Sequence, residues 1–177
     1  MLKHVVVNMK ALESMLFVWA TLCDREKIAD EFFIKLAAMP EMKVAYREDF
    51  DQNAFRRALS AICNNELLSD AGKLEKRFWN NNMWMTEDME ITNMMLEPVK
   101  VLNIDQRLNE LPENIPYQEM EVIFYPGTTE LATLVEDKLY INFFKIQVNI
   151  FDLEAEPTID NQSIEDFIIA ELAKAAV

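Results

Sequence analysis

The sequence predicts an α+β fold, in which N-terminal helices pack on a C-terminal antiparallel β-sheet of about three to four strands and a final C-terminal helix follows. Helical spacing of apolar residues fills most of residues 1–111, and strand-like alternation fills much of residues 119–151. Helical spacing returns over residues 163–176. The 177 residues contain no internal repeat and no linker long enough to separate domains, so we expect a single domain.

The N-terminal part of the chain reads as a series of helices. Val5–Val7 is either a short strand or the lead-in to the first helix, for which Asn8 is a candidate N-cap. Asp24 is a candidate cap for the second helix, which Pro40 ends. The predicted helices span residues 9–23, 24–38, 51–64, 67–78 and 86–97, with a further short helix within 99–111 and a loop at 112–116.

Three consecutive asparagines, Asn80–Asn82, are expected to interrupt the helical pattern, because asparagine favours turns and caps over helix interiors. Thr86 then resembles the N-cap of the next helix, whose first turn carries Glu87 and Glu90. Pro98 disfavours helical backbone at the residue before it, so we expect that helix to end near Glu97.

The sheet begins with two strands, Met120–Tyr125 and Leu131–Val135, which are separated by a turn at Pro126–Gly127. A tight turn at Asp137–Lys138 leads into a long third strand that reaches Ile150. The last helix then begins at a Ser163 cap, after an acidic, solvated loop at residues 152–161.

The alternation changes phase within the third strand, because one apolar set ends at Phe143 and the next begins at Phe144. A β-bulge at Phe143–Phe144 would keep both sets on the core face, and we predict one there. The alternative is a strand that leaves one layer and enters another, which buries its two faces in turn. The two apolar sets are Leu139, Ile141 and Phe143, and then Phe144, Ile146, Val148 and Ile150.

The chain is strongly acidic, with 17 basic and 31 acidic residues and a formal net charge of −14. Nucleic-acid backbones and anionic membrane surfaces attract basic proteins, so we expect neither a nucleic-acid partner nor a membrane partner. The charge instead favours a basic protein partner.

The location of the protein is predicted from its N-terminus and its cysteines. The apolar run Met15–Cys23 follows two lysines, as in a signal peptide, but charged residues stand where a cleavage site belongs, and the run is too short to span a bilayer. Cys23 and Cys63 lie in apolar helical contexts, which favours buried thiols in a reducing compartment. We therefore expect a cytoplasmic protein.

The sequence carries no recognisable catalytic or cofactor motif. Gly72 and Gly127 are the only glycines, which excludes the glycine-rich loops that cradle phosphates, and His4 is the only histidine, which excludes a histidine-based zinc site. Glu87 and Glu90 share a helical face, but acidic residues at a helix start are ordinary dipole complements. We expect no metal, no cofactor and no catalytic residues.

Candidate binding residues come from two unusual segments and one cation. Trp79, Asn81 and Trp84 belong to a stretch that combines tryptophan, methionine and amide side chains, which suits either a ligand pocket, an interface hot spot or a helix corner in the core. Tyr125 and Thr128 lie in a polar turn at the end of a strand. Arg56, with the neighbouring Arg57 and with Arg47, offers a group for a carboxylate or phosphate.

These observations lead to two functional hypotheses. The first is a non-enzymatic protein that acts through protein–protein contacts, either with another protein or as a homodimer, for which an acidic protein that masks a basic partner is one concrete form. The second is a small-molecule-binding protein or an enzyme with a pocket lined by Trp, Arg and Glu. A concave pocket beside Trp79 or Trp84 would discriminate between them.

Overall fold

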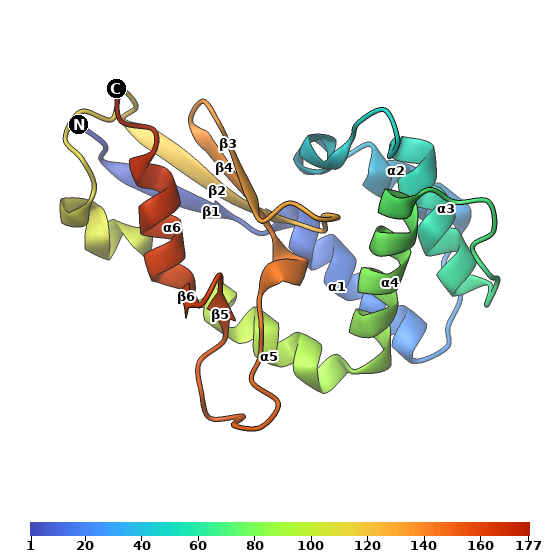
Figure 1. The fold of residues 1–177 in the computed structure, drawn as a ribbon. Coiled ribbons are helices and arrows are strands. Elements are labelled where there is room, and N and C mark those ends of the chain that lie inside the picture. The colour runs from blue at the N-terminus through green and yellow to red at the C-terminus, as the bar shows by residue number, and fades with distance from the viewer. The chain divides into compact units, whose positions relative to one another are not determined.

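The computed structural model describes residues 1–177, and these form two compact units. Unit 1 comprises Met1–Met9, Asn93–Phe124 and Leu131–Val177, and unit 2 comprises Lys10–Thr92 and Tyr125–Glu130. Figure 1 shows helices and strands in one chain, and the α+β class is confirmed. None of the helices has both the length and the apolar character that a membrane crossing requires.

Unit 2 is a helical assembly in which α3 packs against both α2 and α4, while α1 packs against α4 (Figure 1). Asp51 caps α3, because its side chain accepts a hydrogen bond from the backbone N of Ala54 at 2.8 Å. The elements of this unit are α1 (Lys10–Cys23), α2 (Asp30–Ala37), the 3₁₀ helix η1 (Pro40–Ala45), α3 (Gln52–Cys63) and α4 (Lys73–Glu87).

The predicted break at Asn80–Asn82 is wrong, because α4 runs through all three asparagines. Asn82 is buried, and its amide accepts a hydrogen bond from Trp19 Nε1 at 2.9 Å and donates one to the carbonyl of Phe78 at 2.8 Å. Asparagine costs only about 0.5 kcal/mol relative to a good helix former. Hydrogen bonds made by tertiary packing therefore outweigh the local preference for a turn.

The predicted boundaries of the next helix are also wrong. This helix, α5 (Met89–Lys100), begins after Asp88, whose carboxylate accepts from the backbone N of Ile91, whereas the Thr86 hydroxyl donates back to the carbonyl of Met83. Pro98 lies inside the last turn, where only one helix hydrogen bond is lost. Because proline has no N–H, the carbonyl of Met94 lacks its ordinary helix donor.

Unit 1 contains a four-stranded sheet with the order β1-β2-β4-β3. The strands are β1 (His4–Asn8), β2 (Glu119–Tyr125), β3 (Ala132–Val135) and β4 (Lys138–Asn142). The expected antiparallel sheet is wrong, because the sheet is mixed and mostly parallel and its first strand is N-terminal. β1 pairs with β2 in parallel register, from His4 opposite Glu119 to Asn8 opposite Ile123.

β2 is one of the two interior strands of this sheet. Val122, Ile123 and Phe124 are all buried, although successive residues point to opposite faces of the sheet. A strand buried on both faces is typical of a parallel sheet covered on each side. The β3–β4 hairpin is antiparallel and turns after Val135, which pairs with Lys138.

The predicted bulge at Phe143–Phe144 is wrong, because β4 ends at Asn142 and the chain turns into a short 3₁₀ helix, η3 (Phe143–Lys145). Asn142 is buried, and its side-chain oxygen accepts a hydrogen bond from the backbone N of Phe144 at 3.1 Å. The change of apolar phase therefore marks the end of a strand and a capped turn.

The rest of unit 1 consists of short elements and one helix. The Ser163 cap is confirmed, since its hydroxyl oxygen accepts from the backbone N of Asp166 at 3.1 Å. The final helix packs against η2 and the β5–β6 hairpin, and η2 packs against β1 (Figure 1). These elements are the 3₁₀ helix η2 (Ile104–Glu110), β5 (Thr158–Ile159), β6 (Gln162–Ser163) and α6 (Ile164–Ala173).

Candidate functional site

The structure brings Asn81, Tyr125 and Thr128 together within unit 2. Tyr125 is fully buried and Thr128 is 1% exposed. The Asn81 amide nitrogen lies 3.5 Å from the backbone carbonyl oxygens of both Gly127 and Thr128. A side chain of α4 therefore contacts the main chain of this turn. Because Tyr125 and Thr128 are buried, we interpret them as residues that pack within the protein.

Charges also anchor this turn. Glu130 forms an ion pair with Arg47, and the Thr128 hydroxyl donates to the other Glu130 carboxylate oxygen at 3.2 Å. Burial raises the pKa of Tyr125 to about 12, against the opposing effect of the nearby Arg47 charge. The buried phenol therefore stays protonated across the physiological range.

The two tryptophans of α4 lie in different environments. Trp84 is 65% exposed, whereas Trp79 is half-buried and lines a groove of about 820 Å³ together with Leu67 and Leu68. Lys73, Lys76 and Arg77 complete the charged part of the same groove. We call this feature, defined by those six residues, the cationic groove.

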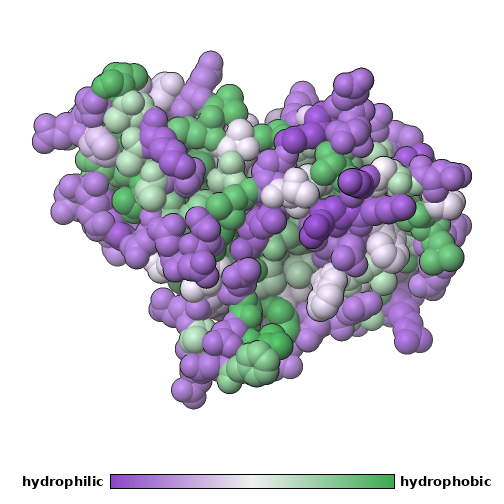
Figure 2. Space-filling view, in the orientation of Figure 1, coloured by the Kyte–Doolittle hydropathy of each residue, from purple (hydrophilic) through white to green (hydrophobic).

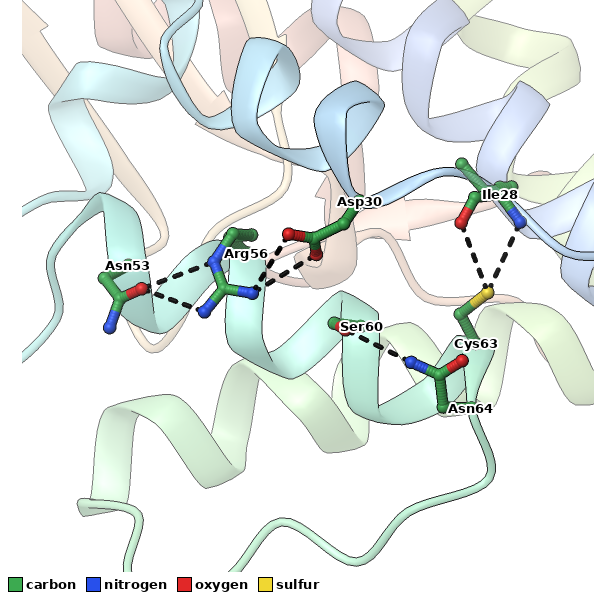
Figure 3. Close-up of polar contacts among 7 residues, drawn as sticks. All are labelled: Ile28, Asp30, Asn53, Arg56, Ser60, Cys63 and Asn64. Carbon is green, nitrogen blue, oxygen red and sulfur yellow. Dashed lines mark hydrogen bonds and ion pairs between the residues drawn. The ribbon is translucent and has the colours of Figure 1, made fainter.

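Arg56 joins α2 to α3 and is already occupied (Figure 3). Its Nη1 lies 3.2 Å from Asp30 Oδ1, and its Nε and Nη2 lie 3.3 and 3.0 Å from Asn53 Oδ1. Arg57 donates both Nε and Nη2 to the buried carboxylate of Glu75, at 2.5 and 2.6 Å. Each arginine is therefore committed to a carboxylate of the protein.

Cys63 also joins α3 to the segment before α2, since its Sγ lies 3.4 Å from the backbone N and 3.7 Å from the carbonyl oxygen of Ile28 (Figure 3). Cys63 is buried and Cys23 is exposed, and both are free thiols. The expectation that both cysteines are buried is thus wrong for Cys23.

A second groove, of about 560 Å³, lies within unit 1 between the end of α5, the loop after η3 and the start of α6. Glu154 and Glu156 are exposed on its rim and take part in no ion pair. We call this feature the acidic groove. Its apolar side chains include Met94, Pro98, Val101, Leu153 and Ile164, and its carboxylates are Glu97, Glu154, Glu156 and Glu165.

The loop at residues 146–157 exposes large apolar side chains next to this groove. Ile150 is 66% exposed, Phe151 94% and Leu153 51%, and Val101 on the groove itself is 75% exposed. Figure 2 shows hydrophobic residues gathered at the lower edge of the visible face, over the loop that Figure 1 draws in orange. The expectation that Ile150 faces the core is wrong, since the strand that would have oriented it ends at Asn142.

No pattern in the sequence indicates the pairing of His4 with Asp105. His4 Nδ1 is hydrogen-bonded to Asp105 Oδ2, and Asp105 Oδ1 accepts from the backbone N of Val5 at 2.8 Å. This pair lines a groove of about 360 Å³ that has no serine, threonine or cysteine on its walls. The pair therefore fastens η2 to β1 and is not matched with a nucleophile.

The carboxylates singled out by the sequence, Glu87 and Glu90, do not belong to a metal-binding group. Nowhere do three or more His, Cys, Asp or Glu side chains converge as metal ligands would. Comparison of the chain with protein-family models, with curated proteins and with solved structures finds no significant match.

Proposed function

We propose that the protein acts by binding another protein, and that the acidic groove with the adjoining residues Ile150 and Phe151 forms the contact surface. The observation that carries this proposal is the concentration of exposed apolar side chains in one loop, of which Phe151 is 94% exposed. Burying one such side chain contributes about 1.5–3 kcal/mol. Large aromatic residues of this kind are typical anchors of interfaces.

The charges around the groove indicate the chemistry of the partner. Glu154 and Glu156 have no cation of the protein beside them, and the pairing of Glu97 with Lys100 is a long one, at 3.8 Å. A partner segment with apolar residues on one face and lysine or arginine on the other would contact the apolar side chains of the groove and pair with the glutamates on its rim.

A second copy of the chain fits this surface less well. Pairing two acidic grooves would oppose the glutamates of one copy to those of the other, in a chain of net charge −14. Like charges placed opposite each other in an interface cost several kcal/mol. The proposed partner is therefore a basic amphipathic segment of another protein.

The test uses a short synthetic amphipathic helix of lysine and leucine, labelled for fluorescence anisotropy. We expect binding to the purified chain, and Phe151→Ser should weaken the affinity about tenfold, which corresponds to about 1.4 kcal/mol. Glu154→Gln combined with Glu156→Gln should weaken it by a similar factor and reduce its salt dependence. Ile34→Ser is the matched control, since Ile34 is a 52% exposed apolar residue of unit 2, and it should leave the affinity unchanged.

A scrambled peptide with the same lysines but no apolar face separates this proposal from simple charge attraction. Equal affinity for both peptides would refute the proposed surface, as would full affinity of the Phe151→Ser variant. A homodimer whose stability depends on Phe151, detected by sedimentation equilibrium, would assign the same surface to self-association.

A further inference from the structure

The cationic groove of unit 2 is large enough for a small molecule. Its volume of about 820 Å³ falls within the range of ligand pockets, about 300–1,000 Å³. One wall is the segment between α3 and α4, with Leu67 and Leu68, and the other is the first half of α4. Leu67 is 89% exposed, so this wall offers apolar surface that the protein itself does not cover.

The charge of this groove is opposite to that of the whole chain. Lys73, Lys76 and Arg77 line it, and no carboxylate does. None of the three cations forms an ion pair, whereas Arg47, Arg56, Arg57 and Arg107 are all paired with carboxylates of the protein. Three unpaired cations around one concave surface favour an anion.

The start of α4 adds to this positive character. Gly72 is the N-cap residue and supplies no side-chain acceptor, so the first backbone N–H groups of a fifteen-residue helix have no capping side chain. A Cβ built on Gly72 would meet no atom within 4 Å, which means that the space beside this helix end is open. Positive helix ends and open space together admit an anionic group.

Trp79 gives the groove an aromatic surface. Its ring lies among the groove residues, and its Nε1 is shielded from solvent with no hydrogen-bond acceptor in the protein. A buried donor without an acceptor is unfavourable. Because water does not reach this N–H group, the indole contributes its partly exposed ring to the groove, and the N–H group is not counted as a contact for a ligand.

We propose that the cationic groove is a binding site for a small amphipathic anion, with a carboxylate, sulfonate or phosphate group at Lys73, Lys76 and Arg77 and an apolar or aromatic body against Trp79, Leu67 and Leu68. This site is independent of the acidic groove, because the two lie in different units of the chain. A small molecule suits the geometry better than a peptide, because the cations occupy only the first turns of one helix.

The probe for this site is the aromatic sulfonate 8-anilinonaphthalene-1-sulfonate, whose fluorescence rises in apolar surroundings. We expect one saturable site that weakens about tenfold in the double variant Lys76→Gln with Arg77→Gln. The matched control, Lys35→Gln with Lys43→Gln, removes the same charge from unit 2 outside the groove and should leave the affinity unchanged. Circular dichroism on each variant establishes that it is folded.

Two further measurements make the proposal falsifiable. Trp79→Phe should reduce energy transfer from tryptophan to the bound dye, and the neutral analogue N-phenyl-1-naphthylamine should bind much more weakly than the sulfonate. Equal binding of the neutral dye would overturn the proposal, as would an unchanged affinity of the Lys76 and Arg77 double variant. Binding to phosphatidylglycerol vesicles without binding of free dye would also overturn it, since the groove would then be a lipid-surface contact.

Discussion

Asn82 shows how a single buried amide can determine the course of a helix. Its side chain links the Trp19 indole of α1 to the Phe78 carbonyl of its own helix, and it is 1% exposed. Replacing it with alanine removes the buried hydrogen bond from Trp19 Nε1 and the one to the Phe78 carbonyl. We expect Asn82→Ala to lower the free energy of unfolding by about 1–3 kcal/mol in urea denaturation.

The neighbouring Asn80 supplies the control, because it is exposed on the same helix and makes no hydrogen bond. Asn80→Ala should be neutral or should raise stability by about 0.5 kcal/mol through helix propensity. Similar stability losses for the two variants would show that helix propensity, and not the Trp19 contact, governs this position.

Two tyrosines of unit 2, Tyr125, which is buried, and Tyr46, which is half-buried, predict a loss of stability at alkaline pH. Burial raises the pKa of Tyr125 to about 12, and burial together with the charge of Asp51 raises the pKa of Tyr46 further above its ordinary value. In the unfolded chain a tyrosine ionises near about pH 10. Each phenol therefore contributes stability that is fully present below about pH 10 and is lost as the pH rises through the folded-state pKa.

Absorbance of tyrosinate against pH checks this prediction. We expect Tyr46 and Tyr125 to ionise together with the loss of tertiary structure, and Tyr125→Phe should raise the pH midpoint of unfolding. Tyr117→Phe is the control, since Tyr117 belongs to unit 1 and is not buried as Tyr125 is, and it should leave the midpoint in place. Ionisation of all tyrosines near their ordinary pKa in the folded protein would contradict the prediction.

At the scale of the elements, local signals were sufficient where an element is defined by its own residues. Ser163 was recognised as a cap because the hydrogen bond of a cap spans only three residues. The β3–β4 hairpin was predicted for the same reason, although its turn falls one residue earlier, after Val135. The sequence was therefore informative about contacts between near neighbours.

The pairing of strands that lie far apart in the chain could not be predicted from the sequence. β1 lies parallel to β2 through the register of His4 with Glu119, and nothing in either segment records which partner it has or in which direction. The prediction of a long third strand was wrong for another reason. Apolar residues continue to alternate with polar ones past Asn142, but the side chain of Asn142 caps η3 and the strand ends there. Alternation of apolar and polar residues indicates which face of a strand is buried, but it does not indicate the residue at which the hydrogen bonding of the strand ends.

The candidate site was predicted in part for a geometric reason. Trp79, Asn81 and Trp84 are close in the chain, but a continuous helix turns about 100° per residue, so Trp79 and Trp84 differ by about 140° and Trp79 and Asn81 by about 200°. The composition identified an unusual segment. Because α4 is continuous, the residues of this segment point in different directions: Trp79 lines the cationic groove, Asn81 contacts the buried turn and Trp84 is exposed to solvent. The acidic groove was missed because Val101 and Leu153 come together only in the folded chain.

At the scale of the whole molecule, the two proposed sites have opposite charge on a chain of net charge −14. The acidic groove follows the overall charge and would attract a basic partner from a distance, which raises the rate of association. The cationic groove opposes it, so an anion must approach against a repulsive field. Its affinity therefore depends on close contact with the lysines, Arg77 and the apolar wall.

Salt should act on folding and on binding in opposite directions. Exposed ion pairs such as that between Lys174 and Glu171 contribute only about 0–1 kcal/mol each, whereas the excess of carboxylates repels itself throughout the folded chain. Raising the ionic strength from about 0.01 to 0.15 M shortens the Debye length from about 30 to 8 Å. We therefore expect the free energy of unfolding to rise over this range, while the affinity for the lysine–leucine peptide falls. Urea denaturation and anisotropy titration at matched salt concentrations measure both, and a stability that fell with salt would mean that the ion pairs outweigh the net repulsion.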